Sequence, residues 1–179
     1  MGLSACALRS LLENDHCRKP SDALVLILAA PRREPPKMKQ LPKTANPLVI
    51  RTDFENQQVW EAICDLIRAP VHEGSESFYA YVEFLEDSDY RNLTKEELLA
   101  IVPRDYDHSF LFVVDRATIA GPSFAILAVP LIEPRGRSFR AIPSQIQSIE
   151  NNLSIANMDF EEFEEAVDKD GIFRGFPRA

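Results

Sequence analysis

Polar residues follow apolar segments at two points of the chain where chemistry could take place. The triplet 51–53 (Arg-Thr-Asp) ends one apolar run, and Asp115 comes directly after the apolar run 109–114. Ligands of α/β proteins usually bind at the carboxyl ends of the strands. A guanidinium at such a place binds anions, and two carboxylates hold a divalent cation or act as an acid–base pair.

Each of these side chains also has a structural interpretation. Asp53 has the residue type of a helix N-cap, and Arg51 could pair across the sheet with Glu83. Asp115 could be a solvated strand end. His108 precedes the run that Asp115 follows, and six strand residues separate the two by about 20 Å, so they form no dyad. The functional interpretation instead gathers Arg51, Asp53, Glu83 and Asp115 in one polar site.

The segment 150–159 (ENNLSIANMD) is the most unusual stretch of the chain. Asn151 and Asn152 would end a helix, and Asn157 and Asp159 would lie in the bend that follows. Such side chains satisfy exposed backbone groups at a helix–helix corner. In the alternative interpretation they hydrogen-bond a partner's backbone, or Asn151 and Asn152 orient a polar ligand at the strand-end site.

The last expected helix carries a dense acidic face. Such a face is most often solvated, but it also attracts a basic partner, the chain's own basic tail included. Together with the bend before it, this helix is the expected protein-interaction surface: Asn157, Asp159, Glu161, Glu162 and Glu165.

Motifs that announce a cofactor or a metal are missing from the sequence. It contains no GxGxxG or Walker loop, no CxxC or HxxxH pair and no GxSxG elbow, so we expect neither metal nor cofactor. Of the three cysteines, Cys64 falls on the buried stripe of an expected helix. A packed free thiol indicates a reducing compartment, and we expect the cytoplasm.

Charge divides the chain into two parts. Residues 1–46 hold eight basic and four acidic residues, a net charge of +4, and residues 47–179 hold 12 basic and 24 acidic residues, a net charge of −12. Five prolines within residues 31–47 favour an extended linker. We expect a largely disordered tail over 1–46 and one domain over 47–179. The acidic body repels phosphate backbones, which argues against nucleic-acid binding there, and no apolar run approaches the about 20 residues of a membrane span.

Apolar segments and helical patterns alternate within the body. The order βαβαβ, a ββ hairpin and two helices predicts an α/β fold, a single mixed sheet of about five strands with helices on its faces. Pairs at capping-box spacing, Thr94 with Glu97 and Asp159 with Glu162, mark two helix starts. The expected strands are 48–52, 78–85, 109–114, 124–132 and 138–142, and the expected helices are 56–68, 95–102, 145–152 and 160–167.

Several segments together resemble a family of small α/β domains of unknown function from bacteria and fungi. The resemblance covers about residues 47–176 and is most specific in the Asn-rich segment. It implies a domain start near residue 47 but no ligand, activity or residue role, and microbes rich in secondary metabolism are among its sources. The segments are LVIRTDF (48–54), AYVEFLEDSDY (80–90), HSFLFVVD (108–115), ENNLSIANMDFEEF (150–163) and GIFRGF (171–176).

We therefore expect a domain that works by binding, with another protein as its partner. Exposed aromatic side chains serve as interface anchors, and four tyrosines are expected to do so here: Tyr79, Tyr81, Tyr90 and Tyr106. The alternative is a small-molecule enzyme, or an accessory protein of a secondary-metabolite pathway, with its polar site at the strand ends. The sequence does not specify an oligomeric state.

Overall fold

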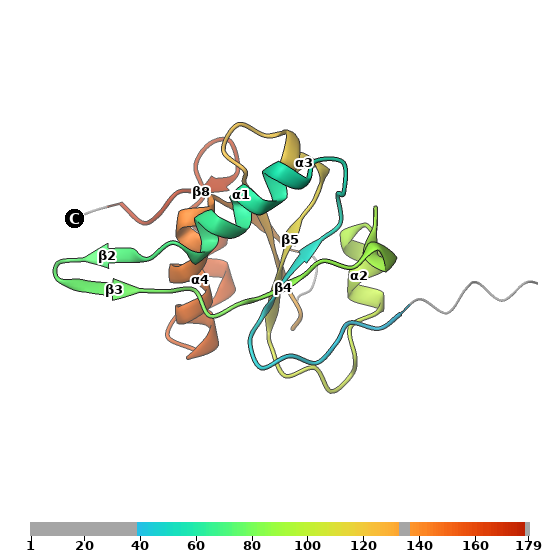
Figure 1. Ribbon diagram of the computed structural model, residues 1–179. Coiled ribbons are helices and arrows are strands. Elements are labelled where there is room, and N and C mark those ends of the chain that lie inside the picture. Colours follow the sequence, from blue (N-terminus) through green and yellow to red (C-terminus); the bar gives the residue numbers. More distant parts are fainter. Residues whose placement is uncertain (1–38, 133–136, 178–179) are drawn as a thin grey trace, which may run out of the picture. The chain divides into compact units, whose positions relative to one another are not determined.

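A six-stranded mixed sheet forms the centre of the domain (Figure 1). The computed structural model describes residues 39–132 and 137–177, so most of the predicted tail lies outside the described residues. The strand order is β4-β1-β5-β6-β7-β8, and only β6 runs against the others. The mixed α/β fold is confirmed, with six strands instead of about five. The strands are β1 (Leu48–Arg51), β4 (Glu83–Leu85), β5 (Phe110–Val114), β6 (Ile126–Pro130), β7 (Phe139–Ala141) and β8 (Ile172–Phe173).

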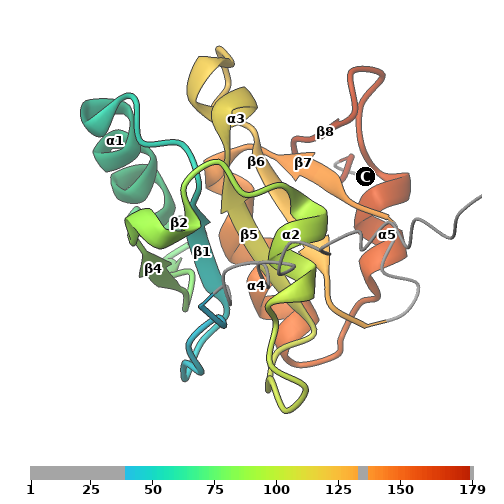
Figure 2. The same cartoon turned by 90° about the vertical axis from the view of Figure 1, so that its right-hand side faces the viewer.

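Helices cover both faces of this sheet (Figure 2). One face packs against α1, α4 and α5, and the other packs against α2 and the short 3-10 helix η1. Successive residues of β5 alternate between the two layers, and all five are buried. The helices are α1 (Gln57–Arg68), α2 (Lys95–Ala100), α3 (Arg116–Ala120), α4 (Ile146–Ser154) and α5 (Phe160–Glu165), with 3-10 turns η1 (Ser88–Tyr90) and η2 (Pro143–Gln145).

Helix α1 begins at Gln57, too far along the chain for Asp53 to be its N-cap. The carboxamide of Asn56 accepts a hydrogen bond from the Val59 N–H at 3.1 Å and is the N-cap. Asp53 is buried, and its carboxylate accepts from the Glu55 N–H at 2.9 Å in the turn before the helix. The N-cap prediction for Asp53 is therefore wrong, because a cap must lie within three residues of the first free N–H groups.

Two short helices owe their start to capping boxes, as predicted. In α2 the Thr94 side chain accepts from the Glu97 N–H, and the Glu97 carboxylate accepts from the Thr94 N–H. Asp159 and Glu162 form the same reciprocal pair at α5. Each box satisfies two backbone donors that a helix of this length otherwise leaves free.

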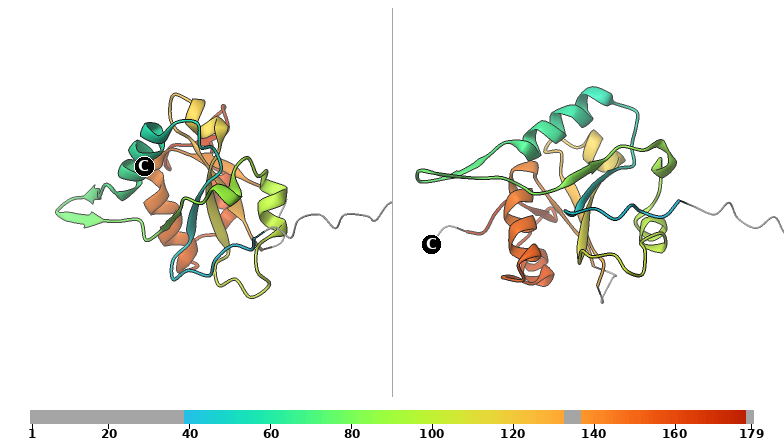
Figure 3. Two further views of the ribbon diagram at one scale, coloured as in Figure 1. Left: turned by 45° about the vertical axis from the view of Figure 1, so that its right-hand side comes forward. Right: turned by 60° about the horizontal axis from the view of Figure 1, so that its bottom comes forward.

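The strand expected over 78–85 is interrupted: Phe78 ends a separate two-stranded hairpin, and residues 79–82 belong to no strand. Strand β2 (Val71–Glu73) pairs antiparallel with β3 (Glu76–Phe78) across a turn in which Gly74 has a φ of +62°. Only β4, at the end of the expected strand, joins the main sheet. Figures 1 and 3 show the hairpin extending away from the rest of the described residues.

The chain before β1 packs onto the η1 and α2 side of the sheet. Leu41 is buried there, and its N–H donates to the Ile101 carbonyl at 3.1 Å. The Tyr90 hydroxyl donates to the Gln40 carbonyl, and Tyr90 is only 1% exposed. Tyr106 is half-buried in the same layer, whereas Tyr79 and Tyr81 are exposed. The prediction of exposure is wrong for Tyr90 and Tyr106 because this segment covers them.

An aromatic cluster packs α5 and the C-terminal segment against β7 and β8. The Phe163 ring lies 5.3 Å from that of Phe173, 5.4 Å from that of Phe176 and 6.2 Å from that of Phe139. Phe163 is fully buried, while Phe176 is 41% exposed. Phe163 is therefore the buried side chain of a helix that is only six residues long.

Truncating Phe163 should destabilise the domain far more than truncating its exposed neighbour. We expect Phe163→Ala to lower the free energy of unfolding by about 3–5 kcal/mol, because a buried ring leaves a cavity. Phe176→Ala is the matched control and should cost less than half as much. Urea denaturation followed by circular dichroism measures both, and equal losses would contradict this packing.

Candidate functional site

The crevice between β1 and β5 is the place where this topology usually binds a ligand. From β1 the chain passes through α1 to β4 on one side, then through α2 to β5 on the other. In this domain the chain itself occupies the crevice. The Thr52 N–H donates to the Val114 carbonyl at 3.0 Å, and the Asn92 N–H donates to the Thr52 carbonyl at 2.8 Å. Thr52 and Asp53 are buried as a result.

Arg51 is a buried cation whose bonds are made within the protein. Its Nε donates to the Asp53 carbonyl at 2.8 Å, and its Nη1 donates to the carboxylate of Glu86 at 2.6 Å and to the Gln57 side chain. The guanidinium lies 4.5 Å from the centre of the Phe54 ring and 5.4 Å from that of Trp60. These contacts tie together β1, α1 and the residue after β4.

The partner of Arg51 is Glu86, so the predicted pair with Glu83 is wrong. In the parallel register of β1 and β4, Leu48 lies opposite Glu83. Leu48 is three residues before Arg51 along β1, so Glu83 is not beside Arg51. Glu83 lies at the other end of β4, where it accepts from the N–H groups of Ala45 and Asn46. The second oxygen of Glu86 accepts from the Trp60 indole at 2.9 Å.

Asp115, at the carboxyl end of the neighbouring strand β5, is bonded by Thr118 and Arg140. Its carboxylate caps α3 through the Thr118 N–H at 2.9 Å and receives two hydrogen bonds from Arg140, at 3.1 and 2.6 Å. Burial opposes ionisation, but the bonds from Arg140 and Thr118 outweigh it and lower the pKa of Asp115. The structure thus keeps Arg51, Asp53 and Asp115 at the carboxyl ends, each engaged by other groups, and places Glu83 elsewhere.

The Asn-rich residues lie away from these strand ends. Asn152 donates to the Ser148 carbonyl within α4 and accepts from the exposed Asn157. Asp159 and Glu162 form the capping box of α5, and Glu161 is half-buried while Glu165 is exposed. Asn151 is exposed on α4.

Asn151 and Asn152 line a groove of about 500 Å³ between α4, the C-terminal segment and the hairpin. We call it the amide groove, because four carboxamides face it. The side of β2 forms one wall, and Phe78 and Phe176 are its aromatic members. Its lining is Val71, His72, Glu73, Phe78, Ser144, Gln145, Gln147, Ser148, Asn151, Asn152, Arg174, Gly175 and Phe176.

Cys64 is buried on α1, as predicted, and borders a second pocket of about 480 Å³ beside Trp60 and Glu86. Burial raises the pKa of its thiol to about 11. A thiol with so high a pKa is a poor nucleophile at neutral pH, so Cys64 serves packing. Cys6 and Cys17 lie outside the described residues.

The described residues contain no group of three His, Cys, Asp or Glu side chains placed to hold a metal ion. In the same part of the chain, no helix has the length and apolar character needed to cross a membrane. Sequence reasoning missed two features, the Arg51–Glu86 pair and the hairpin wall of the groove. The turn Gly74–Ser75 after Pro70 was the available signal for the hairpin.

The fold and these surfaces define an α/β domain with a mixed sheet whose strand-end polar groups are internally bonded. Residues 46–176 match the family model described as a domain of unknown function, DUF6924. The chain belongs to this family. No match was found among curated proteins or among solved structures.

Replacing Arg51 by lysine should destabilise the domain even though the charge is kept. An ammonium cannot bond the Asp53 carbonyl, Gln57 and Glu86 together, so we expect a loss of about 3 kcal/mol. Arg91→Lys is the matched control, because the guanidinium of the exposed Arg91 also contacts Phe54, at 4.6 Å from the centre of the ring. Chemical denaturation measures both variants. A loss for Arg51→Lys no larger than that of the control would contradict the role given to the guanidinium.

Acid should remove the stability that Asp115 contributes. A lowered pKa in the folded state means that this contribution is complete above the unfolded value of about 4 and is lost as pH falls through the folded value. Asp115→Asn keeps a good N-cap and deletes the charge. We expect it to be less stable than the parent at pH 7 and to converge with it toward pH 3.

Urea midpoints between pH 3 and pH 7 measure this convergence. Glu76→Gln, on the exposed hairpin, makes the same change in net charge and serves as the control. Its stability should follow the parent at every pH. A difference between Asp115→Asn and the parent that does not depend on pH would count against the ion pair.

Proposed function

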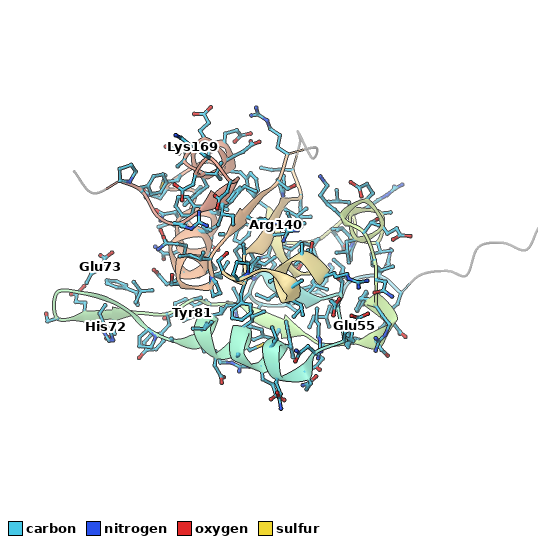
Figure 4. All side chains as sticks on the ribbon, turned by 90° about the horizontal axis from the view of Figure 1, so that it is seen from above. Glu55, His72, Glu73, Tyr81, Arg140 and Lys169 are labelled. Carbon is cyan, nitrogen blue, oxygen red and sulfur yellow. The ribbon has the colours of Figure 1, made fainter. Side chains whose placement is uncertain are left out.

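We propose that this domain is a protein-binding module that grips an extended segment of its partner. The contact surface in this proposal is the hairpin arm, residues 71–81, together with the amide groove at its side. The observation that carries the proposal is the exposure of the arm, since every residue from His72 to Tyr79 is exposed. Figure 4 shows His72 and Glu73 on the arm, apart from the helices.

Exposed aromatic residues on the arm support a partner. Phe78 is 37% exposed, Tyr79 48% and Tyr81 64%. Aromatic side chains are enriched at protein interfaces, where they bury large areas at a small entropic cost. A two-stranded hairpin is at best marginally stable alone in water, so a partner that covers it would also strengthen it.

The outer edge of β2 supports an extended conformation for the bound segment. In a two-residue hairpin the pair that flanks the turn exchanges both hydrogen bonds, so His72 and Ser77 direct their main-chain groups outward. Among the described residues β2 pairs with β3 alone. A peptide strand laid along this edge would fill the amide groove, where carboxamides match the donors and acceptors of its backbone.

Charge supports a basic or neutral segment. The body carries a net charge of −12, which favours association with cations. In the groove itself, Arg174 is already paired with Asp168 and Asp170 at 2.7 Å each. The strand-end residues Arg51 and Asp115 have their own partners, which weakens the alternative of an enzyme site there.

The acidic helix α5 with the bend before it is a second candidate surface for the same function, and the test separates the two. We further infer that the domain works in the cytoplasm, that its body avoids nucleic acids and that its relatives occur in bacteria and fungi. Cys64, a buried free thiol, fits a reducing compartment.

A library of displayed peptides selected on the immobilised full-length protein tests the proposal. The selected peptides should bind His72→Pro at least tenfold more weakly, because proline removes the outward N–H, while His72→Ala should bind within about threefold of the parent. Phe78→Ser should also weaken binding at least tenfold. Isothermal titration with synthetic peptides measures each affinity.

Two outcomes would contradict the hairpin as the contact surface. One is the absence of any selected peptide. The other is a set of peptides that bind the hairpin variants as well as the parent but lose affinity for the double variant Glu162→Lys, Glu165→Lys. That second pattern would move the interaction to α5. Circular dichroism of each variant checks that the fold is kept.

A further inference from the structure

We infer that a separate pocket at the amino ends of β1 and β5 binds a small molecule that carries a protonated amine and an apolar group. The pocket has a volume of about 330 Å³ and lies at the opposite end of β5 from α3. Its polar walls come from three segments: 45–47 before β1, 107–110 at the start of β5 and 150–154 in α4. We call it the Glu150 pocket.

Glu150 is a buried carboxylate without a cationic partner in the described part of the chain. It is 4% exposed. Its two oxygens each accept one hydrogen bond from a neutral donor, the Tyr81 N–H at 3.0 Å and the Ser154 hydroxyl at 2.9 Å. Burying a charge is costly unless an opposite charge accompanies it. A ligand ammonium in the pocket would supply that charge.

The surroundings of Glu150 reinforce the preference for a cation. Asp107 borders the pocket, and His108 is its one basic lining residue, with Nε2 3.0 Å from the Thr44 carbonyl. Lys43, on the segment that leads into one wall, is paired with Asp105 and is not part of the lining. An anionic ligand would therefore meet repulsion and no fixed positive charge.

An apolar annex continues the Glu150 pocket. A neighbouring cavity of about 210 Å³ shares Ser109, Phe110 and Leu153 with it and is walled further by Met158 and Phe160. The Asn-rich segment thus builds both halves, the carboxylate from its first residue and the apolar wall from its end. This division fits an aryl or alkyl group held in the annex while its amine reaches Glu150.

Three probes that share a phenethyl group test the charge preference: phenethylamine, phenethyl alcohol and 3-phenylpropionate. We expect the amine to bind the full-length protein at least tenfold more tightly than the alcohol, and the carboxylate to bind weakest. Glu150→Gln should weaken the amine at least tenfold and leave the alcohol within about threefold. Glu96→Gln makes the same charge change on α2, on the opposite face of the sheet, and should leave all three affinities unchanged.

Titrations followed by two-dimensional ¹H–¹⁵N NMR measure the affinities and locate the site in the unaltered protein. Shifts should concentrate at His108, Ser109 and Leu153. The inference would be overturned by equal binding of amine and alcohol, by tighter binding of the carboxylate, by absence of amine binding or by shifts that centre elsewhere. The unaltered protein alone decides between these outcomes, so the test stands even if Glu150→Gln fails to fold. None of these probes addresses the hairpin arm, so the two proposals succeed or fail separately.

Discussion

The buried guanidinium of Arg51 is the contact on which the arrangement of the first half of the domain depends. It joins the turn after β1, the first residue of α1 and the residue after β4 in one set of hydrogen bonds. A buried cation is tolerated only when its partners are in place, so the start of α1 and the end of β4 are set together. Polar residues that resemble a ligand site at the strand ends are thereby part of the framework.

Local signals in the sequence were enough for much of this fold. The apolar stripe of α1, the continuous apolar run of β5 and the two capping boxes each depend on neighbouring residues, and all were predicted. The pairing of Arg51 was not predictable in this way, because Glu83 and Glu86 are both far from Arg51 in sequence and only three residues apart from each other. Only the register between β1 and β4, a non-local property, brings Glu86 next to Arg51. Strand β8 is two residues long and leaves no pattern to read.

Function is concentrated, in these proposals, on two sides of α4. Asn151 and Asn152 face the amide groove, whereas the adjacent Glu150 is buried in its own pocket. Glu150 also accepts a hydrogen bond from the Tyr81 N–H at the base of the hairpin arm. The Asn-rich segment, the most unusual stretch of the sequence, therefore contributes to both sites. Its residues could be selected as unusual from the sequence, but their separation onto two surfaces required the packing of α4.

The tip of the hairpin has a consequence for how such a domain can diversify. The φ of +62° at Gly74 strains other residue types, but a side-chain carbon there would meet no atom beyond the adjacent residues within 4 Å. The strands on either side pair only with each other in the described structure. The exposed residues from His72 to Tyr79, Gly74 aside, can therefore change in type without disturbing either layer of the core. In the proposed function, the residues that contact the partner therefore lie in one short stretch of the chain, and the residues that stabilise the sheet lie in others.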